Sequence, residues 1–156
     1  MIELELVGVR VELPHNQPIV LLKEREGERF LPIWIGAVEA TSIAFALQGV
    51  VTARPMTHDL MRDLLSNLSV EVERIVVTEL RDGTFYAEIR MTQDGDSIVV
   101  SSRPSDAIAL AVRATVPIYA AEAVLDEAGI EIEDEDEDEV ERFKEFLNSV
   151  SPEDFK

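Results

Sequence analysis

The stretch RPSDAIALAVR, residues 103–113, marks a change from strand to helix around which the rest of the chain is arranged. Pro104 favours an extended conformation at Arg103, so a helix is expected to begin just after this point. Ser105 is a good N-cap residue, and Asp106 places a carboxylate in the first turn, where the helix dipole stabilises negative charge. One arginine and one acid are therefore expected to lie together where a strand ends and a helix begins.

A second junction of the same kind lies earlier in the chain, in RPMTHDL, residues 54–60. Thr57 is the expected cap, with His58 and Asp59 in the first turn of a helix that runs to about Asn67. Two Arg-Pro-cap-Asp junctions in a chain of 156 residues are unusual. We interpret the remaining segments as a scaffold that brings the two junctions together.

The remaining segments predict an α+β fold: a single domain with a mostly antiparallel sheet and helices packed against it. Alternating apolar residues predict a strand over 2–12, and a change of parity at Gly8 indicates a bulge. Asp82-Gly83 and Asp94-Gly95 are hairpin turns that would join three strands into a meander. Further strands are expected at 19–22, 29–35, 70–80, 84–92, 97–101 and 117–119, and further helices at 37–47, at 121–128 and from the Arg103 junction to near Ala114.

The acidic charge is concentrated at the C-terminal end. Residues 122–156 contain 15 acids and 3 bases, a net charge of −12, whereas residues 1–121 contain 17 acids and 11 bases, a net charge of −6. The body is therefore not a basic platform for nucleic acid. Seven consecutive acids at 133–139 cannot pack, and apolar residues at helical spacing follow them. We expect a folded domain over 1–129, an acidic linker over 130–139, and a C-terminal amphipathic helix and tail over 140–156.

Several classes of protein are excluded by what the sequence lacks. The absence of cysteine removes disulfides, thiolate metal ligands and a cysteine nucleophile. No apolar run approaches the ~20 residues needed to cross a bilayer, and no signal peptide is visible. These features lead us to expect a cytoplasmic protein that does not contact a membrane.

The helix expected over 37–47 is apolar on almost every side. Such a helix is either buried or in contact with another subunit, and we expect a homo-oligomer formed through it. Glu39 is the exception on this helix. It is either a solvent-facing acid in the first turn, or a site residue that the turn after Gly36 aims much as Asp59 and Asp106 are aimed.

The polar residues of the two junctions form the candidate site. Asp59, Asp106 and Glu39 supply carboxylates that suit a hard divalent cation such as magnesium or manganese, and His58 would act as general base or ligand. Arginines grip phosphate bidentately. A metal that activates water, beside arginines that neutralise the charge on phosphorus, is the usual machinery of phosphodiester hydrolysis. The candidate phosphate-binding residues are Arg54, Arg103, Arg113 and Ser105.

The same residues also have a purely structural interpretation. The acids can serve only to stabilise helix N-termini, and the arginines only to pair with neighbouring acids and tie loops down. No established metal-ligand pattern and no phosphate-binding glycine loop is present. The two interpretations differ in geometry. Convergence of Asp59, Asp106 and His58 on one open cleft favours an enzyme, whereas saturation of each arginine by its own acid favours a non-catalytic regulatory or assembly module.

Five motifs also occur in order along the chain: LPIWIG at 31–36 followed by Glu39-Ala40, RPMTHDL at 54–60, DGTFYA at 82–87, RPSDAIALAVR at 103–113 and PIY at 117–119. Together they resemble the bacterial and plant bifunctional nuclease domain over about residues 2–129. The resemblance implies nuclease activity on both DNA and RNA and marks the same polar residues as motif positions. We therefore expect a nuclease with little sequence preference, assisted by a divalent cation.

The chain departs from this family pattern in two places. Some members carry an acid just before the second Arg-Pro, where this chain has Ser101-Ser102, and this change removes one candidate metal ligand. Many members also add a C-terminal segment similar to one in nucleotide-excision-repair proteins. That segment is expected to be absent, with the acidic run in its place.

Overall fold

The computed structural model describes residues 1–12 and 17–131 of the chain. Its strands are β1 (Ile2–Glu12), β2 (Gln17–Glu24), β3 (Arg29–Trp34), β4 (Glu71–Arg81), β5 (Thr84–Gln93), β6 (Asp96–Ser102), β7 (Ile118–Ala120) and β8 (Ile130–Glu131). Its helices are α1 (Ala37–Leu47), α2 (Thr57–Asn67), α3 (Pro104–Ala114) and α4 (Glu122–Ala128). The predicted α+β class is confirmed. The closing helix and most of the acidic linker lie outside the described residues.

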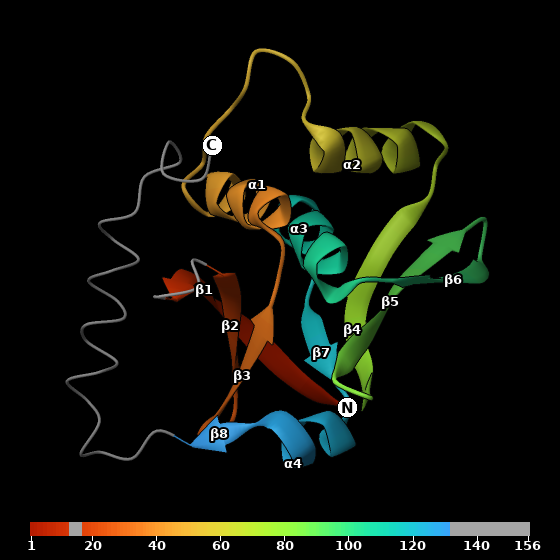
Figure 1. The fold of residues 1–156 in the computed structure, drawn as a ribbon. Helices are drawn as coiled ribbons and strands as arrows, with labels where there is room; N and C mark the ends of the chain where they lie inside the picture. Colours follow the sequence, from red (N-terminus) through yellow and green to blue (C-terminus); the bar gives the residue numbers. More distant parts are fainter. Residues whose placement is uncertain (13–16, 132–156) are drawn as a thin grey trace.

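One eight-stranded sheet runs through the molecule in the order β6-β5-β4-β7-β1-β2-β3-β8 (Figure 1). The first three strands and the β4-β5-β6 meander each pair antiparallel. Between them lies β7, which is antiparallel to β1 and parallel to β4. The bulge expected at Gly8 is confirmed, because the β1–β2 register shifts between Leu6 and Gly8.

Helix α3 is the centre of the packing. It contacts α1 and α2 as well as β4 and β5, and Figure 1 shows it beside α1 in the middle of the molecule. All five residues from Ala107 to Ala111 are buried. Three of them are alanines, whose small side chains let neighbouring helices and strands approach closely. This central position is why both ends of α3 lie close to side chains from other elements.

Helix α1 packs mainly inside its own chain. Residues 39–44 are buried, and the helix contacts β1, β2 and α3. Val38, 75% exposed, and Leu47, 45% exposed, are its large apolar residues that face solvent. The expected burial is confirmed, whereas oligomerisation through this helix stays a prediction. No helix within the described ranges is long and apolar enough to cross a membrane.

The two expected helix caps were wrong by one and two residues. The N-cap of α2 is Met56, and Thr57 is the first helical residue; the N-cap of α3 is Arg103, so Ser105 is already inside the helix. The reason at α3 is Pro104, whose fixed φ and missing N–H suit the first helical position. At α2 the side chain of Asp59 accepts a hydrogen bond from the Met56 N–H at 3.0 Å. A side chain inside the helix therefore accepts the hydrogen bond of the N-cap N–H at the start of α2.

Candidate functional site between helices α1, α2 and α3

The first turns of three helices bring acids and a histidine to one place. Glu39 comes from α1, His58 and Asp59 from α2, and Asp106 from α3. The Arg103 side chain joins this cluster from the N-cap of α3, and Arg113 joins it from the last turn of the same helix. The structure therefore gathers six of the eight residues that the sequence predicted.

Arg103 holds two acids from different helices. Its Nε and Nη2 each lie 2.9 Å from Oδ2 of Asp106, and Nη2 also forms an ion pair with Glu39. The Glu39 residue is only 8% exposed, whereas the Arg103 side chain is 66% exposed. The predicted alternative of a solvent-facing Glu39 is therefore wrong, because this acid is buried beneath an arginine that faces solvent.

His58 continues this chain of contacts into the interior. Its Nε2 lies 2.8 Å from Oδ1 of Asp106, and its Nδ1 lies 2.7 Å from Oγ of Ser42 on α1. An ionised carboxylate can only accept hydrogen bonds, so the proton belongs on Nε2. When the ring is neutral, its Nδ1 then accepts the Ser42 hydroxyl proton. His58 is thus held in one tautomer by groups on both sides.

Ser42 is the site residue that the sequence did not reveal. It lies among alanine, threonine and isoleucine in an apolar helix, and no local motif marks it. Its position three residues after Glu39 puts both on one face of α1, which is the signal that could have identified it. Serine, histidine and aspartate in a row are the set used in nucleophilic catalysis. Ser42 does not fit the nucleophile, because it is 2% exposed and closed to a substrate.

The second half of the cluster centres on Arg113, whose side chain is 5% exposed. Its Nε donates to Oδ1 of Asp59 at 2.7 Å. Its Nη1 donates to the Ala109 carbonyl at 2.9 Å, and its Nη2 donates to the Ser42 carbonyl at 3.0 Å. Ser42 therefore links the two halves, because its hydroxyl contacts His58 and its carbonyl accepts from Arg113.

Both junction acids are ionised at neutral pH. Burial by itself would raise the pKa of Asp106, but hydrogen bonds from His58 and Arg103 outweigh it and hold that pKa below its usual value. Burial likewise opposes ionisation of Asp59, yet the bonds from Arg113 and the Met56 N–H lower its pKa. The hydrogen bond to Asp106 in turn raises the pKa of Arg103.

Two predicted residues do not join the cluster. Arg54 is exposed in the loop between α1 and α2, and its side chain makes no ion pair within the part of the chain that the structure describes. Ser105 is buried at the second position of α3, 5% exposed. Its hydroxyl makes none of the hydrogen bonds of the cluster.

The carboxylates do not fit the metal site that the sequence suggested. Glu39 and Asp106 are both bound by Arg103, and Asp59 is bound by Arg113 on the other side of Ser42. Over residues 1–12 and 17–131, no group of three histidine or acidic side chains could hold an ion. The sharing of these acids with guanidiniums explains the misfit, because each carboxylate already has a cationic partner. Metal dependence stays a prediction without a ligand set.

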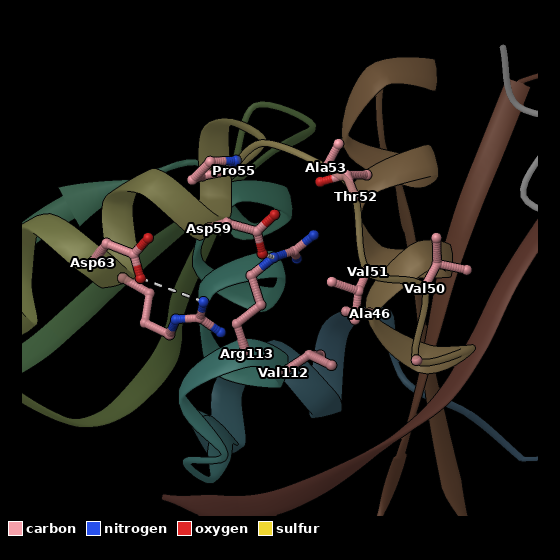
Figure 2. Close-up of a pocket in the computed structure, with 12 residues that line it drawn as sticks. Ala46, Val50, Val51, Thr52, Ala53, Pro55, Asp59, Asp63, Val112 and Arg113 are labelled. Atoms are coloured by element: carbon pink, nitrogen blue, oxygen red, sulfur yellow. Dashed lines mark hydrogen bonds and ion pairs between the residues drawn. The ribbon is translucent and has the colours of Figure 1, made fainter.

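A pocket of about 430 Å³ opens beside the Asp59–Arg113 pair (Figure 2). One wall is the apolar loop that follows α1, and the other is the polar side of α2, where Arg62 and Asp63 form an ion pair at 3.4 Å. The cluster therefore borders a cavity on its Asp59 side and solvent on its Arg103 side. The pocket is lined by Ala46, Gly49, Val50, Val51, Thr52, Ala53, Pro55, Asp59, Arg62, Asp63, Val112 and Arg113.

Comparison with known proteins places the chain in a family. The family model of the bifunctional nuclease domain matches residues 20–133, which include the whole cluster. The chain belongs to the bifunctional nuclease domain family. The resemblance noted in the sequence is thereby confirmed.

Relatives of this bifunctional nuclease domain protein fall into two groups. The uncharacterized Mycobacterium tuberculosis protein Rv1829 is 52% identical over 163 residues, which cover 99% of this chain and 98% of the relative. Bifunctional nuclease 2 of rice is 32% identical over 65% of this chain and 33% of its own length. Bifunctional nuclease 2 of Arabidopsis thaliana is 30% identical over 67% of this chain and 32% of its own length. The chain thus spans about a third of the plant proteins.

Proposed function

We propose that this protein is a nuclease that hydrolyses phosphodiester bonds of DNA and RNA with little sequence preference. Membership of the bifunctional nuclease domain family and the names of the plant relatives support the reaction class. The structural observation that carries the proposal is Arg103, an exposed guanidinium at the outer end of a buried hydrogen-bonded chain through Asp106 and His58.

Arg103 is the proposed phosphate-binding residue. A guanidinium has five N–H donors, and its contacts to Glu39 and Asp106 involve Nε and Nη2. The Nη1 group is left to donate to a phosphate oxygen on the solvent side. Arg54, exposed in the loop before α2, would add a second contact. Contacts of this kind bind the phosphate backbone of the nucleic acid rather than its bases, so they predict a low sequence preference.

Asp106 is proposed to orient the attacking water. Its side chain is 26% exposed, and the bonds from His58 and Arg103 fix the direction of its carboxylate. Its lowered pKa makes it a weak base, so we assign it orientation of the water rather than uptake of a full proton. The water oxygen would attack phosphorus, the bond to the leaving oxygen would break, and protons would be exchanged with solvent.

Cleavage of single-stranded DNA and RNA by the purified chain tests this proposal, with magnesium, manganese or a chelator present. Asp106→Asn and Arg103→Gln should each lower the cleavage rate about 100-fold. Arg81→Gln is the matched control, since this arginine is 59% exposed on a distant hairpin. Equal cleavage by all four proteins would point to a contaminant, and no cleavage by the wild type would overturn the proposal.

A non-catalytic regulatory or assembly module is the second candidate, and one observation favours it. Arg103 and Arg113 are each bound by acids, and these pairs tie α1, α2 and α3 together. In that case the cluster stabilises the fold and the protein acts through self-association or a protein partner. Absence of cleavage under every metal condition, together with a folded wild type that loses stability in Arg113→Ala, would support this second function.

A further inference from the structure

Strand β6 forms one edge of the sheet and has an open outer side. Within the described ranges its neighbour is β5 alone. Natural sheets usually protect such an edge with charged side chains, proline or a bulge. Residues 97–102 contain neither charge nor proline, and the β5–β6 register runs without a shift. Val99 is 51% exposed and Val100 is 45% exposed. This edge is therefore open to pairing with another strand.

The backbone groups that point outward along β6 follow from its hairpin. Gln93 and Asp96 flank a two-residue turn in which Asp94 has φ 51° and Gly95 has φ 84°. In such a turn the flanking residues exchange hydrogen bonds, and alternate residues then bond to the neighbouring strand. The residues that bond to β5 are Asp96, Ile98, Val100 and Ser102. The residues whose N–H and C=O groups point away from β5 are Ser97, Val99 and Ser101.

We propose that β6 pairs with β6 of a second copy of this chain, antiparallel and about a two-fold axis at Val99. In this register Val99 lies opposite its own copy, and Ser97 lies opposite Ser101. Each of these pairs can exchange two backbone hydrogen bonds. Ile98 then lies opposite Val100 on the helix-covered face, because these two residues pair with buried Met91 and Ile89 of β5. Serine therefore pairs with serine across the interface, and apolar residues pair with apolar residues.

The choice of a second copy rests on self-complementarity and on charge. The three outward residues are symmetric about Val99, which an isologous two-fold contact requires. The chain carries a net charge of −18, so two copies repel each other, and an uncharged contact surface is the kind that adds no like-charge pairs to that repulsion. The opposite edge of the sheet is β8, two residues long, with seven consecutive acids soon after it at 133–139. Helix α1 has already buried residues 39–44 within its own fold.

Sedimentation equilibrium of the full chain tests the pairing. The wild type should have twice the chain mass of 17.4 kDa. Val99→Lys should weaken the dimer at least tenfold, because it places like charges opposite each other across the axis. Val38→Lys is the matched control on α1, where Val38 is 75% exposed, and it should remain dimeric. A monomeric wild type at high concentration, or a dimer lost in Val38→Lys and kept in Val99→Lys, would overturn the proposal.

A crosslinking experiment tests the register and the position of the axis. The chain has no cysteine, so a single introduced thiol is unambiguous. Val99→Cys places two thiols opposite each other, with Cα atoms about 5.5 Å apart, and a short bifunctional thiol reagent should link them at high yield. Ser97→Cys places its thiols several residues apart, so it should crosslink poorly. Equal yields from the two variants would contradict the register.

Discussion

The two Arg-Pro junctions look alike in the sequence and behave differently in the structure. In the junction at residues 103–113, Arg103 is the N-cap and Asp106 is the third helical residue, so the two bond within one turn. In the junction at residues 54–60, Arg54 lies two residues before the cap, Met56, and does not pair with Asp59. Arg113 from α3 takes that place. The distance from arginine to cap decides whether a junction satisfies its own acid.

This difference assigns different tasks to the two junctions. The Arg103 junction is local and half open, with an arginine side chain 66% exposed. The Asp59 junction is long-range and its arginine is buried, since Arg113 comes from another helix and its side chain is 5% exposed. We therefore expect the Asp59 junction, which pairs with Arg113, to matter for stability and the Arg103 junction to matter for binding and activity.

Removal of the two paired arginines should give the largest contrast. Arg113→Ala leaves Oδ1 of Asp59 and the Ser42 carbonyl without the arginine donor, and should lower the free energy of unfolding by about 3 kcal/mol, the low end of the range for a broken buried pair. Arg103→Ala removes an exposed partner and should cost about 1 kcal/mol or less. Urea denaturation of both variants measures the contrast. Similar losses would mean that the two junctions are equally structural.

Ser42 should contribute next, because it touches both junctions. Ser42→Ala leaves Nδ1 of buried His58 without its donor and should cost about 1–2 kcal/mol. Ser66→Ala, exposed on α2, is the matched control and should cost less than about 0.5 kcal/mol. Nitrogen NMR of the wild type should place the proton of neutral His58 on Nε2, and His58→Gln assigns the signal because the chain has two histidines. A proton on Nδ1 would reverse the proposed bond to Ser42.

Low pH should destabilise both junctions through their acids. The pKa values of Asp59 and Asp106 lie below the ordinary value of 3.8 in the folded chain. Their stabilising contribution is complete above that value and is lost as the pH falls through the lowered pKa values. Asp106→Asn and Asp59→Asn should therefore each flatten the fall in stability below pH 4. If the stability of one variant falls as steeply below pH 4 as that of the wild type, the acid replaced in that variant does not cause the loss of stability.

Replacement of Arg54 should have the smallest effect on stability, so it tests the proposed role of this residue in phosphate binding separately from folding. Arg54→Ala removes a side chain that makes no ion pair within residues 1–12 and 17–131, and unfolding should change by less than about 0.5 kcal/mol. Binding of single-stranded DNA, measured by fluorescence anisotropy at several salt concentrations, should weaken and depend less on salt. Unchanged binding would leave Arg103 as the phosphate contact supported by the structure.

Much of the fold could be predicted because short-range sequence patterns determine its helices and hairpin turns. The helix over 37–47 has the predicted bounds, and both Asp-Gly turns close the hairpins that their type favours. The caps were missed, since Pro104 outcompetes Ser105 for the start of α3. The parallel pairing of β7 with β4 was also missed, because a strand of three residues carries no periodic signal.

The candidate site shows the limit of such patterns. The sequence supplied the chemical types of Glu39, His58 and Asp106, and the structure places all three in one cluster, with Arg103 joining Glu39 to Asp106. The sequence could not show which side chains pair with each other. The Asp59–Arg113 contact spans 54 residues, and the contact of His58 with Asp106 spans 48. Ser42 remained hidden because a hydroxyl in an apolar helix has no distinctive neighbours in the sequence. Which guanidinium neutralises which acid is decided by helix packing.

The position of β7 has a consequence for the chain during its synthesis. Residues 118–120 are the link between the β1-β2-β3 half of the sheet and the β4-β5-β6 half. Strand β1 is made before β7, so its Ile2–Leu4 segment has no partner on one side until residues 118–120 leave the ribosome. At ribosomal speeds of about 5–20 residues per second, that interval is roughly 5–20 s. A nascent chain therefore leaves the Ile2–Leu4 edge of β1 without its β7 partner for seconds, and chaperone capture at this stage is the expected consequence of placing the linking strand so late after β1.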